Sequence, residues 1–138
     1  MTTAGVLAGI GSLHAAWAAG SAFPMKDRRE LSQVVAGIDV MPTPPQCLAV
    51  AGALGVASAL VADIGPVPPG LRKLGVTTAS GVLAVRGACG IAGQTKRLVP
   101  WTPSQRFVEL DRKYFGPLCL MLATGAANAL RSARGSRG

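Results

Sequence analysis

Four long apolar runs divide the sequence and set the main constraint on its fold. They cover about residues 2–24, 46–67, 74–93 and 114–130. The hydrocarbon core of a bilayer is about 30 Å thick and is crossed by about 20 predominantly apolar helical residues. Charged residues form 14% of the chain, whereas a soluble domain has about 25%. The sequence therefore predicts a multi-pass protein of the cell membrane, an all-α antiparallel four-helix bundle in one domain over residues 1–130.

The segment between the third and fourth runs carries a helix-start signal. Thr102 is a candidate N-cap, Pro103 suits the first helical position, and Gln105 completes a capping box. Apolar residues then recur on one helical face, with charged residues beside them. We therefore predict a short interfacial helix before the fourth span. Residues 131–138 are predicted to form a basic C-terminal tail.

Small residues recur every four positions on the first and third runs. Membrane helices associate through close contact, which small side chains permit. This pattern favours packing within one chain, with association into a homo-oligomer as the alternative. The small residues are Ala4, Ala8, Ser12, Ala16 and Gly20 on the first run and Ser80, Ala84, Ala88 and Ala92 on the third.

The chain is strongly basic, with a formal net charge of +8 at pH 7. Its Lys and Arg residues lie mainly between the apolar runs and do not alternate with base-stacking aromatic residues, so no nucleic acid partner is expected. Anionic lipid headgroups are the simpler partner, although the same charges would also set the membrane topology. Cys47, Cys89 and Cys119 lack CxxC spacing and are interpreted as small buried side chains. Neither a metal ion nor a cofactor is expected.

One ionisable side chain, Arg86, lies well inside a predicted span. At about 1.5 Å per residue it sits about 10 Å below the nearer membrane face, where a charge is costly. A long arginine side chain can reach Asp111 at that face, and Tyr114 follows one helical turn later. Trp17 on the first run lies at a depth that matches that of Arg86, and His14, on nearly the same face, lies about 15 Å below this membrane face. The sequence therefore predicts a candidate polar chamber built from these five residues.

The members of this chamber also have structural explanations. The Arg86–Asp111 pair would fix the registry of two helices. His14 would hydrogen-bond a neighbouring helix, and Trp17 would anchor at the membrane interface. Asp63, near the end of the second run, is interpreted as a helix-end or turn residue.

The sequence contains no catalytic signature that would define a reaction. It has no GxSxG, P-loop, HExxH or dinucleotide-binding fingerprint. If the chain is an enzyme, His14 would act as the acid or base while Arg86 holds an anionic head group. The prediction is therefore a structural or accessory membrane protein. The alternatives are a lipid- or small-anion-binding protein, with or without enzymatic activity, and a minimal oligomeric transporter.

Three motifs in the sequence resemble a known bacterial family. They are His14-x-x-Trp17 in the first run, Leu74-Gly75 with Arg86-Gly87-x-x-Gly90 in the third run, and a longer motif from Thr102 to Leu120. Over about residues 7–127, the chain is similar to the small membrane proteins that carry domain of unknown function 3995. This resemblance implies a four-helix membrane fold. It carries no established activity, so it assigns no functional residue.

Overall fold

The computed structural model describes residues 2–135, and its elements over this range are all helical. The all-α class predicted from the sequence is therefore confirmed. The helices run in the order α1 (Thr3–Ala18), α2 (Arg28–Val35), α3 (Pro44–Ala62), α4 (Pro69–Ile91), η1 (Thr95–Arg97), α5 (Gln105–Leu110), η2 (Asp111–Phe115) and α6 (Gly116–Gly135). Here η1 is a short 3₁₀-helix and η2 is a π-helix. Of the predicted basic tail, residues 131–135 continue α6 and residues 136–138 lie outside the described range.

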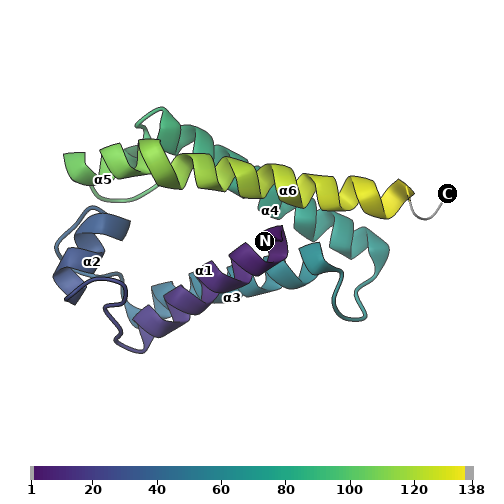
Figure 1. The fold of residues 1–138 in the computed structure, drawn as a ribbon, viewed down its shortest axis with the longest axis horizontal. Helices are drawn as coiled ribbons and strands as arrows, with labels where there is room; N and C mark the ends of the chain where they lie inside the picture. Colours follow the sequence, from purple (N-terminus) through teal and green to yellow (C-terminus); the bar gives the residue numbers. More distant parts are fainter. Residues whose placement is uncertain (1, 136–138) are drawn as a thin grey trace.

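The four long helices form two antiparallel pairs arranged as a V (Figure 1). Helix α1 packs along α3, and α4 packs along α6. The pairs meet near the N-terminus and diverge toward the end of the molecule that carries α2 and α5. At that wide end, α2 contacts α5. The arrangement is therefore more open than a four-helix bundle in which all helices pack around one continuous core.

The main hydrophobic core lies where the two pairs meet. Each long helix contributes to the buried set, which consists of Leu7, Ala57, Val61, Val76, Leu122 and Ala126. A Cβ on Gly11 of α1 would lie only 3.3 Å from the carbonyl oxygen of Ala51 on α3. The Ser58 hydroxyl donates to the carbonyl of Ala4 over 2.7 Å. Because close approach of this kind stabilises helix pairs, small residues of α1 and α3 serve packing within the chain.

Between the first two runs, the structure contains a helix, α2, that was not predicted from the sequence. Its N-cap is Asp27, whose carboxylate accepts a hydrogen bond from the Glu30 N–H over 2.8 Å. This is a favourable cap. Leu31 of α2 is fully buried and packs with Trp17 and Cys47 in a second, smaller core. Helix α2 thus covers the wide end of the α1–α3 pair.

Arginine side chains cover the carboxyl ends of α1 and α3. The buried Arg72 donates from Nε to the carbonyl of Leu60 over 2.8 Å, and Nε lies 3.0 Å from Oδ1 of Asp63. Asp63 ends α3 in the left-handed conformation, with φ 58°, which agrees with its interpretation as a helix-end residue. Arg28 donates to the carbonyl of Trp17 over 3.0 Å. The last carbonyl groups of a helix have no hydrogen-bond donor within that helix. The two arginines therefore stabilise the carboxyl ends of α1 and α3.

The helix boundaries differ from those of the predicted runs. Helix α1 ends at Ala18 rather than near residue 24, because the chain turns at Gly20 with φ 101°. Helix α3 ends at Ala62 rather than near residue 67. Helix α4 begins at Pro69 rather than at residue 74, since proline is well suited to the first helical turn. The turns are as apolar as the helices beside them, so hydrophobicity alone misplaces the ends.

The predicted start of the last helical segment is wrong by two residues. Ser104, not Thr102, is the N-cap, and its hydroxyl accepts a hydrogen bond from the Phe107 N–H over 3.3 Å. The N–H of Ser104 itself donates to the carbonyl of Gly37 over 2.9 Å, which holds this residue extended. Helices α5, η2 and α6 then follow without a break. The short helix predicted before the fourth span is therefore the first part of one long helical segment.

Two helices among residues 2–135, α3 and α4, are long and apolar enough to cross a membrane. They have 19 and 23 residues, which at about 1.5 Å per residue correspond to about 28 and 34 Å. These lengths bracket the hydrocarbon thickness of about 30 Å.

Candidate functional site

Arg86 on α4 and Asp111, the first residue of η2, form a close ion pair. Arg86 Nη2 lies 2.8 Å from Asp111 Oδ1, and Nη1 donates a hydrogen bond to Oδ2 over 3.0 Å. The carboxylate is fully buried, whereas the side chain of Arg86 is 30% exposed. Two guanidinium nitrogens thus face two carboxylate oxygens, as in forked arginine–carboxylate pairs. The structure therefore contains the contact that the depth of Arg86 predicts.

Thr95, at the start of η1, is a third member of this cluster, which sequence reasoning missed. It is buried, and its hydroxyl donates to Asp111 Oδ2. The other oxygen, Oδ1, has its ionic contact to Arg86 but no hydrogen bond. Asp111 is therefore held from α4 and from η1, and it sets the direction of the guanidinium. A threonine in a connection carries no spacing signal that could have identified this role.

Glycines on α4 allow the segment that carries Asp111 to approach closely enough to form the pair. A Cβ on Gly90 would lie 2.9 Å from Asp111 Oδ1. One on Gly87 would lie 2.8 Å from the carbonyl oxygen of Gly116. Contacts this short require a shift of the structure, so glycine is the residue that fits at both positions. The Arg86-Gly87-x-x-Gly90 motif thus places the arginine beside a tight crossing of α4 with the last helical segment.

The π-helical turn η2 joins the ion pair to α6. The Gly116 N–H donates to the carbonyl of Asp111, five residues earlier. Pro117 follows directly, and it has no N–H to donate to the preceding turn. The wider π turn accommodates this missing donor, and such turns are frequent at functional sites.

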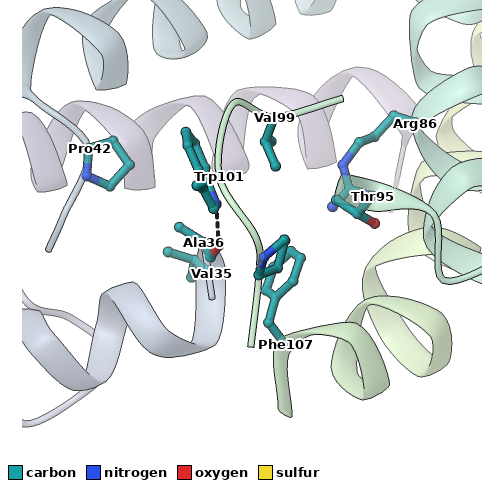
Figure 2. A pocket seen from close by; sticks show the side chains of 9 residues that line it. Val35, Ala36, Pro42, Arg86, Thr95, Val99, Trp101 and Phe107 are labelled. Atoms are coloured by element: carbon teal, nitrogen blue, oxygen red, sulfur yellow. Dashed lines mark hydrogen bonds between the residues drawn. The ribbon is translucent and has the colours of Figure 1, made fainter. Parts of the chain in front are cut away.

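A cavity of about 190 Å³ lies beside the ion pair, near the wide end of the V. It is lined by Val35, Ala36, Pro42, Arg86, Thr95, Val99, Trp101, Pro103 and Phe107. Figure 2 shows Arg86 and Thr95 at one end of this cavity and Pro42 and Trp101 at the other. The cavity is therefore amphipathic: the guanidinium of Arg86 lies at one end, and aliphatic and aromatic carbon forms most of the remainder.

Two hydrogen bonds hold the outer wall of the cavity in place. Trp101 Nε1 donates to the carbonyl of Ala36 over 2.9 Å (Figure 2), and the Ser104 N–H donates to the carbonyl of Gly37 over 2.9 Å. Gly37 has φ 74°, and a Cβ at this position would lie 2.8 Å from the Cβ of Phe107. The connection between η1 and α5 is thus tied to the end of α2, which belongs to the other arm of the V.

His14 and Trp17 lie together on α1, outside this cavity. Their ring centroids are 4.7 Å apart. His14 Nδ1 is 2.9 Å from the carbonyl oxygen of Ile10 in its own helix, and Trp17 Nε1 donates to the carbonyl of Phe23 over 2.7 Å. Within residues 2–135, no hydrogen bond or ion pair joins either side chain to the ion pair on the other arm. His14 is therefore not among the residues that line the cavity beside that pair.

Tyr114 also lies apart from the cavity. Tyr114 is exposed. Lys113 Nζ lies 5.2 Å from the centroid of its ring, which makes an exposed cation–π contact. Of the five residues predicted for a polar chamber, the structure brings together Arg86 and Asp111 as one pair. His14 and Trp17 form a second pair on the opposite arm.

A second, more open hollow of about 520 Å³ lies on the other side of the connection before α5. Its lining is Gln33, Gly37, Ile38, Asp39, Thr102, Ser104 and Arg106. The hydrogen bond from Gln33 lowers the pKa of Asp39 most, followed by the hydrogen bond from Arg29 and the charge of Arg29.

Among residues 2–135, no three His, Cys, Asp or Glu side chains are grouped closely enough to hold a metal ion.

These features define a small all-α protein with two helices that could cross a membrane and a buried arginine–aspartate pair beside an amphipathic cavity. The chain belongs to the family of proteins of unknown function DUF3995, which matches residues 7–126. The resemblance seen in the sequence motifs is therefore confirmed. No curated protein and no solved structure is significantly similar to the chain.

Proposed function

We propose that the chain is a four-span protein of the cell membrane with a structural or accessory role. The observation that carries this proposal is the outward-facing apolar surface of α3 and α4. Of the residues in their most apolar stretches, 11% in α3 and 17% in α4 are buried, whereas most residues in the core helix of a soluble protein are buried. Val56 on α3 and Val82 on α4 are 61% and 64% exposed. In water, exposed apolar surface costs about 25 cal/mol per Å², whereas lipid tails are as apolar as these side chains.

The other two spans are assigned to α1 and α6. Helix α1 contains no Lys, Arg, Asp or Glu and packs along α3, while α6 packs along α4. The two antiparallel pairs therefore offer four segments of alternating direction to a bilayer. At about 1.5 Å per residue, the 16 residues of α1 and the 20 residues of α6 reach about 24 and 30 Å. Arg131 and Arg134 at the end of α6 suit the membrane surface.

Anionic lipid headgroups are the proposed partner of the exposed basic residues. Lys96 and Arg97 of η1 and Arg112 and Lys113 of η2 are all exposed. They belong to the end of the molecule that also carries the cavity. A Lys or Arg near an anionic leaflet contributes about 1 kcal/mol of attraction. These residues would therefore hold the wide end of the V at headgroup level.

Spin labels on the outward faces test the four-span proposal. The three free cysteines are replaced by alanine, and Val56→Cys or Val82→Cys is labelled after reconstitution into vesicles. Both labels are expected to collide more often with oxygen, which concentrates in hydrocarbon, than with a water-soluble nickel chelate. Lys96→Cys in η1 is the exposed control and should show the reverse order. Labels at Val56 and Val82 that behave like the control would contradict the proposal.

A second candidate function is the binding of a small anion or a lipid headgroup. One observation favours it: the guanidinium of Arg86, although paired with Asp111, lines a cavity and is not fully buried. A pair that only fixes helix registry needs no open space beside it. Cation and cavity together are the elements that an anion site requires.

Association into a homo-oligomer and a minimal transport function stay predictions. Close contacts use Gly11 of α1 within the chain, whereas Gly9 of α1 and Gly52 of α3 have open space around them. Small residues with open space permit another helix to approach. A transporter built on this fold would need several copies to form a pathway, which native mass measurement in mild detergent would detect.

A further inference from the structure

The cavity beside Arg86 combines a cationic end with an apolar body. We propose that it binds a small amphiphilic monocarboxylate, about the size of benzoate or octanoate, with its carboxylate at Arg86 and its carbon body against Trp101 and Phe107. This inference rests on the second candidate function and names its ligand class.

The head of the ligand is determined by the hydrogen-bond donors that Arg86 retains. A guanidinium has five N–H donors. Within residues 2–135, Arg86 donates one hydrogen bond, to Asp111 Oδ2, and makes one further ionic contact through Nη2. Asp111 is buried and does not line the cavity, so its carboxylate presents no oxygen to a ligand there. Arg86 therefore faces the cavity as a donor that its partner holds in position.

The charge around the cavity favours an anion over a cation. The Arg86–Asp111 pair is neutral as a unit, but Lys96 and Arg97 directly follow Thr95 of the lining and are exposed. The whole chain carries a net charge of +8. Basic side chains grouped near a cleft raise the local concentration of anions. A cationic ligand would meet this potential without an accessible carboxylate to neutralise it.

The body of the ligand is determined by the remaining lining and by the volume. The indole N–H of Trp101 already donates to the carbonyl of Ala36, so its ring offers carbon to the cavity. Val99, Pro103 and Phe107 extend the apolar wall. A cavity of about 150 Å³ holds benzene, so the present 190 Å³ accommodates a ring or a short chain with one carboxylate. Inorganic phosphate would leave the apolar wall uncovered.

Fluorescence titration tests this proposal. The sequence has two tryptophans, so Trp17→Phe leaves Trp101 as the reporter in protein reconstituted into nanodiscs. Octanoate should change this fluorescence saturably and bind at least tenfold more tightly than octanol, which has the same chain without the charge. The double variant Arg86→Met, Asp111→Leu, which removes both charges together, should bind octanoate at least tenfold more weakly. Arg106→Met, at an exposed arginine of α5, is the matched control and should bind like the parent.

A second variant fills the apolar end and leaves the ion pair intact. Val99→Phe should also weaken octanoate binding at least tenfold, and inorganic phosphate should not displace octanoate. Equal affinity for octanol, unchanged binding in the double variant or in Val99→Phe, or displacement by phosphate would overturn the proposal. The spin-label measurement is independent: lipid-facing labels without octanoate binding would reject the ligand and retain the four-span protein. Octanoate binding with water-exposed labels would reject the four-span proposal and retain the ligand.

Discussion

Among the single residues, Asp111 has the largest expected effect on stability. It is completely buried, and its negative charge is matched by Arg86 and by the hydroxyl of Thr95. Removing one member of a buried pair leaves an uncompensated charge and costs about 3–5 kcal/mol. We expect Asp111→Ala to lower the free energy of unfolding by about that amount. The combined change Arg86→Met with Asp111→Leu should cost less than half as much, because apolar groups then replace both charges. Denaturant unfolding in mild detergent measures both.

An exposed ion pair provides the comparison for this prediction. Arg29 and Asp39 lie 3.5 Å apart, with side chains 71% and 61% exposed. Asp39→Ala is expected to change the free energy of unfolding by less than about 0.5 kcal/mol, because surface pairs contribute little. A double variant at the buried pair that loses as much stability as Asp111→Ala would show that an isolated charge is not the cause.

The Arg86–Asp111 contact could be predicted because a charge deep in an apolar run needs an opposite charge, and few acidic residues lie within its reach. The rise per residue places Arg86 near one membrane face, and Asp111 is a carboxylate within its reach. The role of Thr95 could not be predicted, since a threonine is tolerated in many environments. The position of His14 relative to the cavity could not be predicted either. The spacing of residues along the sequence shows which side chains share a face of α1, but it does not show which helix packs against that face.

Among the elements, α4 contains both a glycine in close packing and a glycine in open space. Gly87 and Gly81 both lie within it, but a Cβ on Gly87 would come within 2.8 Å of a backbone oxygen, whereas one on Gly81 would have nothing within 4 Å. Gly87→Ala should therefore lower the free energy of unfolding by about 1–3 kcal/mol through overpacking. Gly81→Ala should raise it by up to about 1 kcal/mol, because alanine has the higher helix propensity. Thermal melts followed by circular dichroism distinguish the two, and a shift of the same sign for both would contradict this account of the crossing.

The long apolar helices and the short helix α5 were predictable, whereas α2 and the π turn were not. An apolar run of about 20 residues defines a helix by itself, which is why α3 and α4 appear near their predicted places. Helix α2 depends on Asp27 as a cap and on one buried leucine, Leu31, a pattern too short to stand out among charged residues. The π turn lies where Pro117 lacks a donor and where Gly116 packs against α4, and only the first of these features can be read from the sequence.

The molecule as a whole consists of two arms joined differently at their two ends. A shared hydrophobic core joins them at the narrow end. Near the wide end, hydrogen bonds such as that from Trp101 to Ala36 connect the arms. Trp101→Phe keeps an aromatic ring and removes this donor. We expect faster hydrogen exchange in residues 98–104 and in α2, with no change around Val76 in the core.

Trp17→Phe is the control for that exchange experiment. It removes an indole hydrogen bond of similar length, to the carbonyl of Phe23, which lies within one arm. Its effect should be confined to the turn after α1. Equal effects of the two changes on residues 98–104 would show that the link between the arms is not specific to Trp101.

The alternating direction of the four long helices follows from their consecutive order along the chain, but the choice of partners does not. Helices α1 and α3 pair closely because Gly11 meets Ala51, and α4 pairs with the last segment because Gly87 meets Gly116. All four long helices carry small residues, so composition alone permits other pairings. The V shape is therefore a product of specific contacts that the sequence pattern leaves undetermined.

The separation between the narrow core and the cavity has a mechanical consequence. The main core joins the two arms at the narrow end, so a small rotation at this joint would displace the wide end by a much larger distance and would strain its links, such as the hydrogen bond from Trp101 to Ala36. The buried residues at the joint, such as Leu7 and Val76, would hardly move, while the space between Arg86 and Trp101 would widen or narrow. The size of molecule that the cavity can hold would therefore depend on the angle between the two arms.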